Sequence, residues 1–301
     1  MSKWIGGYEC ITPMRTAGSG SARWCMARRG RESFFLKEFL TPVYPAQEDT
    51  PLGIRQRERC EQFESRKQRL YSAISCVIGD TLTPVVDFFR FGQRYYAVSE
   101  ALPQECMNAE AFAVWDAEEK RRVLYALALC LQRLHAQGIV HADLKPEHVL
   151  LMRHPDGFHP RLIDLDSGFL TDEPPEKDLE GDPVYLAPET FLRMAGERVK
   201  LNTAVDTFAF GAMIHQLWTG TLPSYDREKY QYLYEAALEE DEIVLSDSLP
   251  EAWRETLQRM LHRDPYQRPT DVRVTALFER EPVIERRRFR QLNGLSRLMR
   301  V

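Results

Sequence analysis

The sequence predicts an α+β fold in which a small, mainly β lobe is followed by a larger helical lobe. Up to about residue 100, short segments are rich in aromatic and β-branched residues, the residue types that strands prefer. From about residue 110, apolar residues recur every three or four positions, which is the helical period. Because strands come first and helices afterwards, the pattern favours α+β over a parallel α/β sheet. We expect a β lobe over 1–102, a helical lobe over 103–280 and a basic tail over 281–301.

Two strands and one helix stand out in the β lobe. The segments FFLKEF at 34–39 and RYYAVSE at 94–100 predict strands because they are aromatic and branched. Residues 55–74 are highly charged and contain neither Gly nor Pro. Their apolar residues fall on one edge, so this segment predicts a helix. Residues 41–50 include two prolines and predict an irregular connector.

The helical lobe begins with a helix around 124–134, where leucines recur at intervals of three, four and three residues. That spacing gives one apolar face, and Gly138 ends the helix. A second helix is predicted from about 203 to 218, ending at Gly220. The apolar spacing over 253–261 predicts that the last third is helical as well.

Composition limits the possible partners and locations. With 301 residues, 44% of them hydrophobic, the chain can bury a sizeable core. A net charge of −5 gives no overall attraction to nucleic acid or to an anionic membrane. We find no secretory leader and no apolar run near the ~20 residues of a membrane span. The six cysteines are scattered without a C-x-x-C pair, so we expect a cytoplasmic protein with reduced thiols.

Six short motifs carry the chemistry. In chain order they are Gly18-Ser19-Gly20, Lys37 at the end of FFLK, HADLKPEH at 141–148, RLIDLDSG at 161–168, GDPVYLAPE at 181–189 and DPYQRPT at 264–270. Glycines let backbone N–H groups approach phosphate oxygens. The third and fourth motifs supply Asp, Lys and His, residue types that accept protons, neutralise phosphate charge and bind metal. Taken together, the six motifs resemble those of the protein kinase family, and the resemblance covers nearly the whole chain.

The resemblance implies a bilobal kinase fold and ATP as the phosphoryl donor. The catalytic residues would be Asp143 as the base and Lys145 as a contact to the transferred phosphoryl group. A lysine at that position is typical of serine/threonine kinases. Asp164 and His148 would hold the divalent metal, Mg²⁺ or Mn²⁺.

The resemblance also assigns residues to nucleotide binding and to support of the loop. Gly18 and Gly20 would cover the phosphates, and Lys37 would contact the α- and β-phosphates. Its carboxylate partner would be Glu64, or alternatively Glu61. The remaining expected residues are Glu100 and Leu102 in the adenine-binding hinge, Asp206 as the aspartate that hydrogen-bonds the catalytic-loop backbone, and Glu189 with Arg268 as a buried ion pair.

Several residues depart from the family pattern. Ala142 replaces the loop arginine, His148 replaces the metal-binding asparagine, and Arg23 stands where a third glycine is usual. Imidazole is a softer ligand than an amide oxygen, but the kinases of lipopolysaccharide sugars resemble this pattern of Asp, His and I-D-L. In place of D-F-G the chain has Asp164-Leu165-Asp166. We favour Asp164 as the metal ligand, with Asp166 as an auxiliary group, over an alignment on Asp166-Ser167-Gly168.

Regulation and substrate preference are expected from the segment 171–182. Its only hydroxyl is Thr171, and it is otherwise strongly acidic. Ala142 also replaces the loop arginine that usually receives a phosphate from this segment. Together these features predict a kinase that needs no activating phosphate. The acidic run also suggests a basic protein substrate. The Arg-rich tail, 285–301, is a candidate docking segment for an acidic partner.

The expected function is therefore transfer of the ATP γ-phosphate to Ser or Thr of a protein. A pseudokinase acting as a nucleotide-binding scaffold is the first alternative, because of Arg23, Ala142 and His148. A small-molecule or sugar kinase is the second, and the motifs at 181–189 and 264–270 argue against it. The unusual catalytic loop suggests a bacterial origin. Nucleic acid is an unlikely partner.

Overall fold

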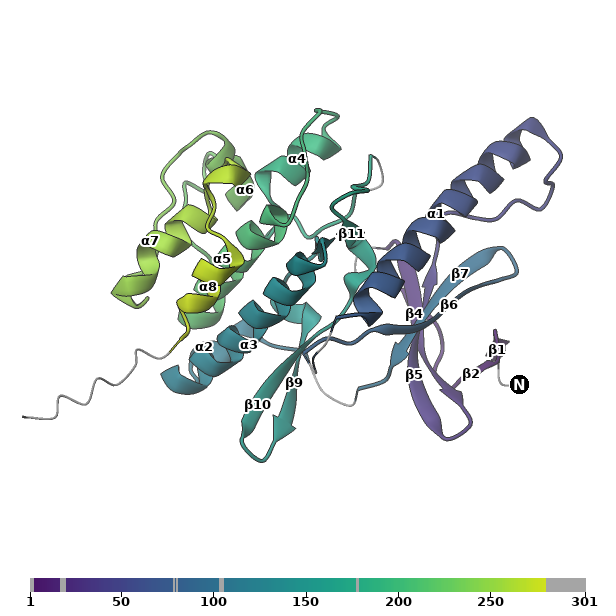
Figure 1. The fold of residues 1–301 in the computed structure, drawn as a ribbon, viewed down its shortest axis with the longest axis horizontal. Coiled ribbons are helices and arrows are strands. Elements are labelled where there is room, and N and C mark those ends of the chain that lie inside the picture. Colours follow the sequence, from purple (N-terminus) through teal and green to yellow (C-terminus); the bar gives the residue numbers. More distant parts are fainter. Residues whose placement is uncertain are drawn as a thin grey trace, which may run out of the picture.

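The structure is a computed structural model, and it describes residues 3–16, 20–77, 79, 81–102, 106–176 and 179–279. Strands gather in the N-terminal part and helices in the C-terminal part, and the long helix α1 (Pro51–Ser75) lies on the sheet side (Figure 1). The fold is therefore the α+β, two-lobed arrangement that the sequence predicts. Gly18 and the tail 281–301 lie outside the described residues.

An antiparallel sheet makes up most of the first lobe. Its strands are β1 (Lys3–Ile5), β2 (Tyr8–Cys10), β3 (Arg15–Thr16), β4 (Ala22–Arg29), β5 (Glu32–Phe39), β6 (Val85–Phe91) and β7 (Arg94–Glu100). They are ordered β1-β2-β4-β5-β7-β6, with β3 paired to β4. Lys37 lies opposite Trp24 on one neighbouring strand and Ala97 on the other. The lysine therefore occupies the middle of the sheet.

Helix α1 packs on this sheet through aromatic side chains. Thr50 caps its first turn by accepting a hydrogen bond from the N–H of Gly53 at 3.0 Å. The Phe63 ring lies 5.3 Å from that of Phe39 and 5.2 Å from that of Tyr95. The face of α1 that carries Phe63 is thereby fixed against the sheet, and this contact sets which of its polar residues reach the cleft.

The second lobe is a helical bundle. Its helices are α2 (Ala109–Ala113), α3 (Ala117–Ala136), α4 (Pro188–Met194), α5 (Ala204–Thr219), α6 (Leu233–Leu238), α7 (Glu251–Met260) and α8 (Asp271–Ala276). Helix α5 is buried along nearly its whole length, which explains why it is apolar on all sides. It forms the centre of the bundle.

Short strands and turns follow α3. They are β8 (Ile139–Val140), a 3₁₀ turn at Pro146–His148, β9 (Val149–His154), β10 (Gly157–Leu162), a 3₁₀ turn at Leu165–Ser167 and β11 (Phe169–Leu170). Strand β8 pairs with β11, and β9 pairs with β10. The loops 141–148 and 163–168 are consequently held side by side, although 15 to 27 residues separate their ends in sequence.

Most element predictions are confirmed. The strand predicted over 94–100 is β7, the helix predicted over 55–74 is α1 with a few more residues, and the one predicted over 203–218 is α5 displaced by one residue. Within the part of the chain that the structure describes, no helix combines the length and apolarity that crossing a membrane requires.

Candidate active site

Helix α5 positions the catalytic loop through one buried carboxylate. Asp206 accepts hydrogen bonds from the N–H of His141 at 2.7 Å and from that of Ala142 at 2.9 Å. Ala142 has a φ of 65°, a left-handed conformation that a residue with a Cβ adopts only where its surroundings enforce it. Asp206 thus fixes the backbone bend from which Asp143 projects.

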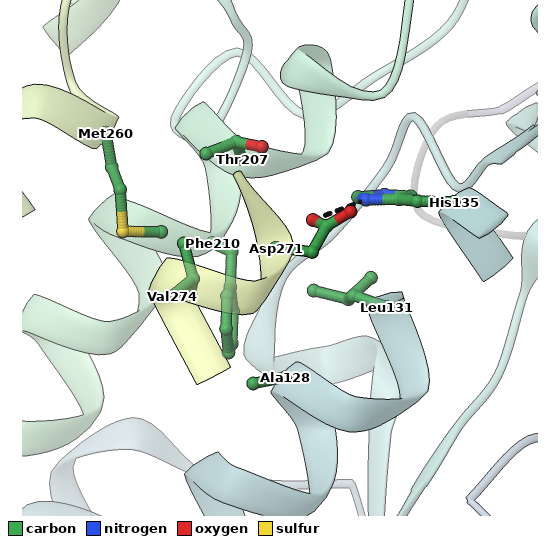
Figure 2. Close-up of a pocket in the computed structure, with 8 residues that line it drawn as sticks. All are labelled: Ala128, Leu131, His135, Thr207, Phe210, Met260, Asp271 and Val274. Atoms are coloured by element: carbon green, nitrogen blue, oxygen red, sulfur yellow. Dashed lines mark hydrogen bonds and ion pairs between the residues drawn. The ribbon is translucent and has the colours of Figure 1, made fainter. Parts of the chain in front are cut away.

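A buried histidine holds Asp206 in turn. His135, on α3, lies 3.0 Å from Asp206 and 2.8 Å from Asp271 on α8. Figure 2 shows the ring of His135 facing Asp271 at the edge of a hollow lined by apolar side chains such as Leu131 and Phe210. Burial alone would lower the pKa of His135, but hydrogen bonds to the two carboxylates outweigh it and raise the pKa to about 9. A protonated His135 therefore links three helices behind the loop.

The Asp143 carboxylate faces a lysine and a backbone N–H. One oxygen accepts a hydrogen bond from the N–H of Asp182 at 2.9 Å, and the other lies 3.2 Å from the Lys145 ammonium. Lys145 also lies 3.4 Å from the Asp182 carboxylate. Burial would raise the pKa of Asp143, but His148, Lys145 and the Asp182 N–H together hold it below its usual value. Asp143 is therefore ionised at neutral pH and can accept a proton.

His148 lies between Asp143 and Asp164. Its Nδ1 is 2.7 Å from the Asp143 carbonyl oxygen, and its Nε2 is 3.6 Å from an Asp164 carboxylate oxygen. Because a carbonyl only accepts hydrogen bonds, Nδ1 must carry a hydrogen, and in the neutral ring the lone pair is then on Nε2, toward Asp164. Protein histidines that bind metal are commonly oriented in this way.

This pair fits a divalent cation that is also held by phosphate. In the described ranges, no group of three or more His, Cys, Asp or Glu side chains could hold a metal without help. Ions in nucleotide-dependent enzymes are typically bound by one or two side chains together with substrate phosphates. His148 and Asp164 match that requirement. Asp164 itself has a left-handed backbone, with φ and ψ of 59°.

Lys37 reaches the same cleft from β5. Its ammonium lies 2.7 Å from Asp164 and 2.8 Å from Asp166. Burial would lower the pKa of Lys37, but the charges of Asp166 and Asp164 outweigh it and raise that pKa. Burial likewise opposes ionisation of Asp164, and Lys37 and His148 overcome it, so that the pKa of Asp164 is lowered. Lys37, Asp164 and Asp166 therefore form one charged network, and His148 faces it through Asp164.

The sequence predicts Glu64 as the partner of Lys37, but the ion pairs of Lys37 in the described residues are with Asp164 and Asp166. Its carboxylate is 3.4 Å from the Tyr95 hydroxyl, and Glu61 lies 3.7 Å from Arg57. The reason is helical register. Phe63 turns toward the sheet, and Glu64, one residue later, is rotated by about 100° around the axis. In this structure Asp164 and Asp166 neutralise Lys37 instead.

Two functional candidates on α1 were missed from the sequence. Lys67 donates a hydrogen bond to the Asp166 carbonyl, and the Tyr71 hydroxyl donates to the Asp166 carboxylate at 2.6 Å. Lys67 lies one helical turn beyond Phe63 and Tyr71 lies two turns beyond it, on the same face of α1. The spacing 63, 67, 71 was readable in the sequence, but a lysine in a charged helix gave no sign that it faces the cleft.

The other residues predicted to contact the nucleotide are on or next to the strands of the first lobe. Gly20 follows β3 and has a φ of 74°, which suits the turn into β4. Glu100 ends β7 and lies 3.5 Å from Arg161. Leu102 is half-buried where the chain leaves the sheet. On the sheet face that carries Lys37, the rings of Trp24 and Phe35 stack at 5.2 Å, a pair that the motif comparison did not anticipate.

A buried ion pair supports the segment that follows the cleft. Arg268 donates hydrogen bonds to both carboxylate oxygens of Glu189, at 2.6 and 2.8 Å. It also donates to the carbonyl of Ala204 at 2.7 Å. The structure thus brings together the two residues that the motifs at 181–189 and 264–270 supply, and it joins them to the start of α5.

Comparison with known proteins agrees with this geometry. The protein kinase domain matches residues 55–280. The chain is 29% identical over 195 residues to hormonally up-regulated neu tumor-associated kinase homolog A of Xenopus laevis, covering 62% of this chain and 27% of that protein. It is 29% identical over 228 residues to mouse ribosomal protein S6 kinase alpha-2, covering 70% and 29%.

A bacterial relative is similar over a shorter stretch. Serine/threonine-protein kinase PkaA of Streptomyces coelicolor is 30% identical over 147 residues, covering 48% of this chain and 26% of that protein. The chain therefore spans less than a third of the length of these relatives. Since the protein kinase domain matches residues 55–280, which is more than half of the chain and includes both α1 and the helical lobe, the chain belongs to the protein kinase family.

Proposed function

We propose that the protein transfers the γ-phosphoryl group of ATP to a serine or threonine hydroxyl of a protein substrate. The observation that carries the proposal is the convergence of Asp143, Lys145 and Asp164 around His148. Asp143 lies 3.2 Å from Lys145 and 3.5 Å from His148, which lies 3.6 Å from Asp164. Such transfer depends mainly on positioning and electrostatics, and these side chains supply both.

Each residue has one role in this mechanism. Asp143 accepts the proton of the attacking hydroxyl, and its lowered pKa keeps it ionised for that purpose. Lys145 neutralises charge on the phosphoryl group as it moves toward the acceptor. Lys37 binds the non-transferred phosphates from the opposite wall of the cleft. Gly18 and Gly20 belong to the loop proposed to cover them, and Glu100 and Leu102 to the segment proposed to bind adenine.

His148 and Asp164 are the proposed metal ligands. A divalent cation there supplies neutralisation of the phosphate charge when it is bound. A carboxylate and an imidazole form a donor set that suits Mn²⁺ at least as well as Mg²⁺. We therefore expect Mn²⁺ to support activity as well as Mg²⁺ or better.

Lys145 favours a Ser or Thr acceptor, and the acidic segment 171–182 favours basic substrate sequences.

A nucleotide-binding scaffold without transfer is the second candidate. The observation in its favour is His148 at the metal position, together with Ala142 at that of the loop arginine. The ion pairs of Lys37 with Asp164 and of Lys145 with Asp143 favour an enzyme over a scaffold.

The test is transfer of radiolabelled phosphate from ATP to a generic basic protein and, in a parallel assay, to a sugar acceptor, with Mg²⁺ and with Mn²⁺. Label on serine or threonine that disappears in Asp143→Ala supports the proposal. Label on a sugar acceptor and none on protein supports a small-molecule kinase. Nucleotide binding without transfer in either metal identifies a scaffold and contradicts the enzyme.

A further inference from the structure

Asp166 has more partners in the cleft than its place in the motif suggests. One carboxylate oxygen lies 2.8 Å from the Lys37 ammonium, and the other accepts the Tyr71 hydroxyl at 2.6 Å. Its backbone carbonyl accepts a hydrogen bond from Lys67. One residue therefore contacts β5 through its side chain and α1 through both its side chain and its backbone.

The two aspartates of the segment differ in exposure. The Asp164 side chain is 34% exposed, whereas that of Asp166 is 12% exposed. Asp164 also faces His148, but each oxygen of Asp166 already has a partner within the protein. Asp164 is thus open to a ligand in the cleft, and Asp166 is committed to holding other side chains.

Asp166 contacts a second lysine, Lys67 of helix α1, in addition to Lys37. Helix α1 brings Lys67, rather than a carboxylate, next to the Lys37 network. Burial is the main cause that lowers the pKa of Lys67, and repulsion by Lys37 lowers it further. Lys67 also lies 5.1 Å from the Phe39 ring, where the cation is stabilised by the aromatic face. The two lysines have Asp166 in common: Lys37 contacts its carboxylate, and Lys67 donates to its backbone carbonyl.

We propose that Asp166 is the residue that positions Lys37 for the nucleotide phosphates, and that Tyr71 and Lys67 couple helix α1 to Lys37 through it. This rests on the proposed function in that Lys37 is taken to bind phosphate. The carboxylate that fixes the lysine then comes from the 163–168 loop, and α1 contributes hydrogen-bond donors. Asp166 is a positioning residue, since it acts through Lys37.

The experiment measures binding of fluorescent mant-ADP with Mg²⁺ to the full chain, which requires no phosphoryl transfer. Because a charge-assisted hydrogen bond to Lys37 is lost, Asp166→Asn should bind at least about tenfold more weakly. Tyr71→Phe should lose roughly threefold. Glu64→Gln, which changes the helix carboxylate expected from the sequence, should remain within about twofold of wild type.

A double variant separates positioning from general damage. If Tyr71 acts through Asp166, then Asp166→Asn combined with Tyr71→Phe should bind no more weakly than Asp166→Asn alone. Should Asp166→Asn lack a cooperative thermal transition, Tyr71→Phe carries the test by itself, and wild-type affinity in that variant overturns the proposal. So does wild-type affinity in Asp166→Asn, or a tenfold loss confined to Glu64→Gln.

Kinetics adds an independent readout where transfer is observed. Asp166→Asn should raise the KM for ATP more than it lowers kcat, whereas Asp164→Asn should mainly lower kcat. If wild type binds mant-ADP but transfers no phosphate, the proposed function fails, and the affinities above still decide the role of Asp166. If transfer is observed and Asp166→Asn has the KM of wild type, the role of Asp166 fails alone.

Discussion

At the scale of single residues, His148 is the departure from the family pattern that bears most directly on catalysis. The asparagine usual at its position offers a neutral oxygen, while an imidazole offers one nitrogen lone pair. The hydrogen bond from Nδ1 to the Asp143 carbonyl fixes the ring, so Nε2 cannot turn away from Asp164 without losing it. The substitution therefore changes the chemistry of the ligand but keeps its direction.

We predict that His148→Asn changes the metal preference. An amide oxygen suits Mg²⁺ better than an imidazole does, so the ratio of the rate with Mn²⁺ to that with Mg²⁺ should fall by about tenfold. Initial rates over a titration of each metal measure it. His159→Asn, at an exposed position in strand β10, is the matched control. An unchanged ratio in His148→Asn would remove His148 from the metal site.

A second residue-scale prediction concerns stability. The side chains of Arg268 and Glu189 are only 1% and 5% exposed, so removal of one partner leaves a buried charge. Arg268→Ala should lower the free energy of unfolding by about 3 kcal/mol or more. Urea denaturation measures this. The double variant Arg268→Met with Glu189→Leu should recover part of the loss, and recovery of none would contradict an electrostatic origin.

At the scale of elements, helix α1 is tied to the segment after the cleft as well as to Asp166. Arg69 lies 3.0 Å from Asp172 and also pairs with Glu173. These carboxylates occupy the segment in which the family commonly carries a regulatory phosphate. The contact supports the expectation that acidic residues replace a phosphate, although exposed pairs of this kind are individually weak.

We predict that Arg69→Ala reduces activity a few-fold at low salt, and that the difference from wild type shrinks at high salt because exposed charges are screened. Arg66→Ala on the same helix is the control, since the contact that Arg66 makes within the described part of the chain is a hydrogen bond to the Gln62 carbonyl of its own helix. Activity measured at two salt concentrations provides the comparison. A loss that is the same at both would indicate a cause other than this ion pair.

The elements themselves were largely predictable, and their registers were not. One apolar edge located α1 to within a few residues, because burial of one face imposes the period, and Gly220 marked the end of α5. The partner of Lys37 depended instead on where a loop 127 residues away, at Asp164, places its carboxylates. Charges along α1 look alike in sequence, so Glu64 and Lys67 could not be ranked until the packing of Phe63 was known.

At the scale of the whole molecule, the two lobes meet around the loops 141–148 and 163–168. The N–H of Thr83 donates to the Leu162 carbonyl at 2.9 Å, and that of Leu162 donates to the Thr81 carbonyl at 2.8 Å. On the far side, His135 joins α3, α5 and α8 beneath the loop. The motifs predicted this overall arrangement well, because each one requires a particular neighbour. No motif predicted His135.

We predict a pH dependence of stability from His135. Its pKa is raised from its ordinary value near 6.5 to about 9, so the folded state binds the proton more tightly than the unfolded chain does. The contribution, roughly 3 kcal/mol, is complete below about pH 6.5 and is lost as the pH rises through about 9. It depends on Asp206 and Asp271, which face the ring.

Urea denaturation of wild type and His135→Gln between pH 6 and 10 measures this contribution. The stability difference between the two proteins should decrease toward high pH, because only wild type loses the proton. Other groups that titrate in this range affect both proteins alike. A difference that does not change with pH would contradict a protonated His135 in the folded state.

The most direct test of phosphoryl transfer at this site is the single-turnover rate of wild type and Asp143→Asn with radiolabelled ATP, Mn²⁺ and a basic protein acceptor. Asn keeps the size of the side chain but cannot accept the proton. We expect the rate to fall by about 10²- to 10⁴-fold, with mant-ADP affinity unchanged within about twofold. Equal rates in the two proteins, or no transfer by wild type with Mn²⁺, would contradict catalysis by Asp143.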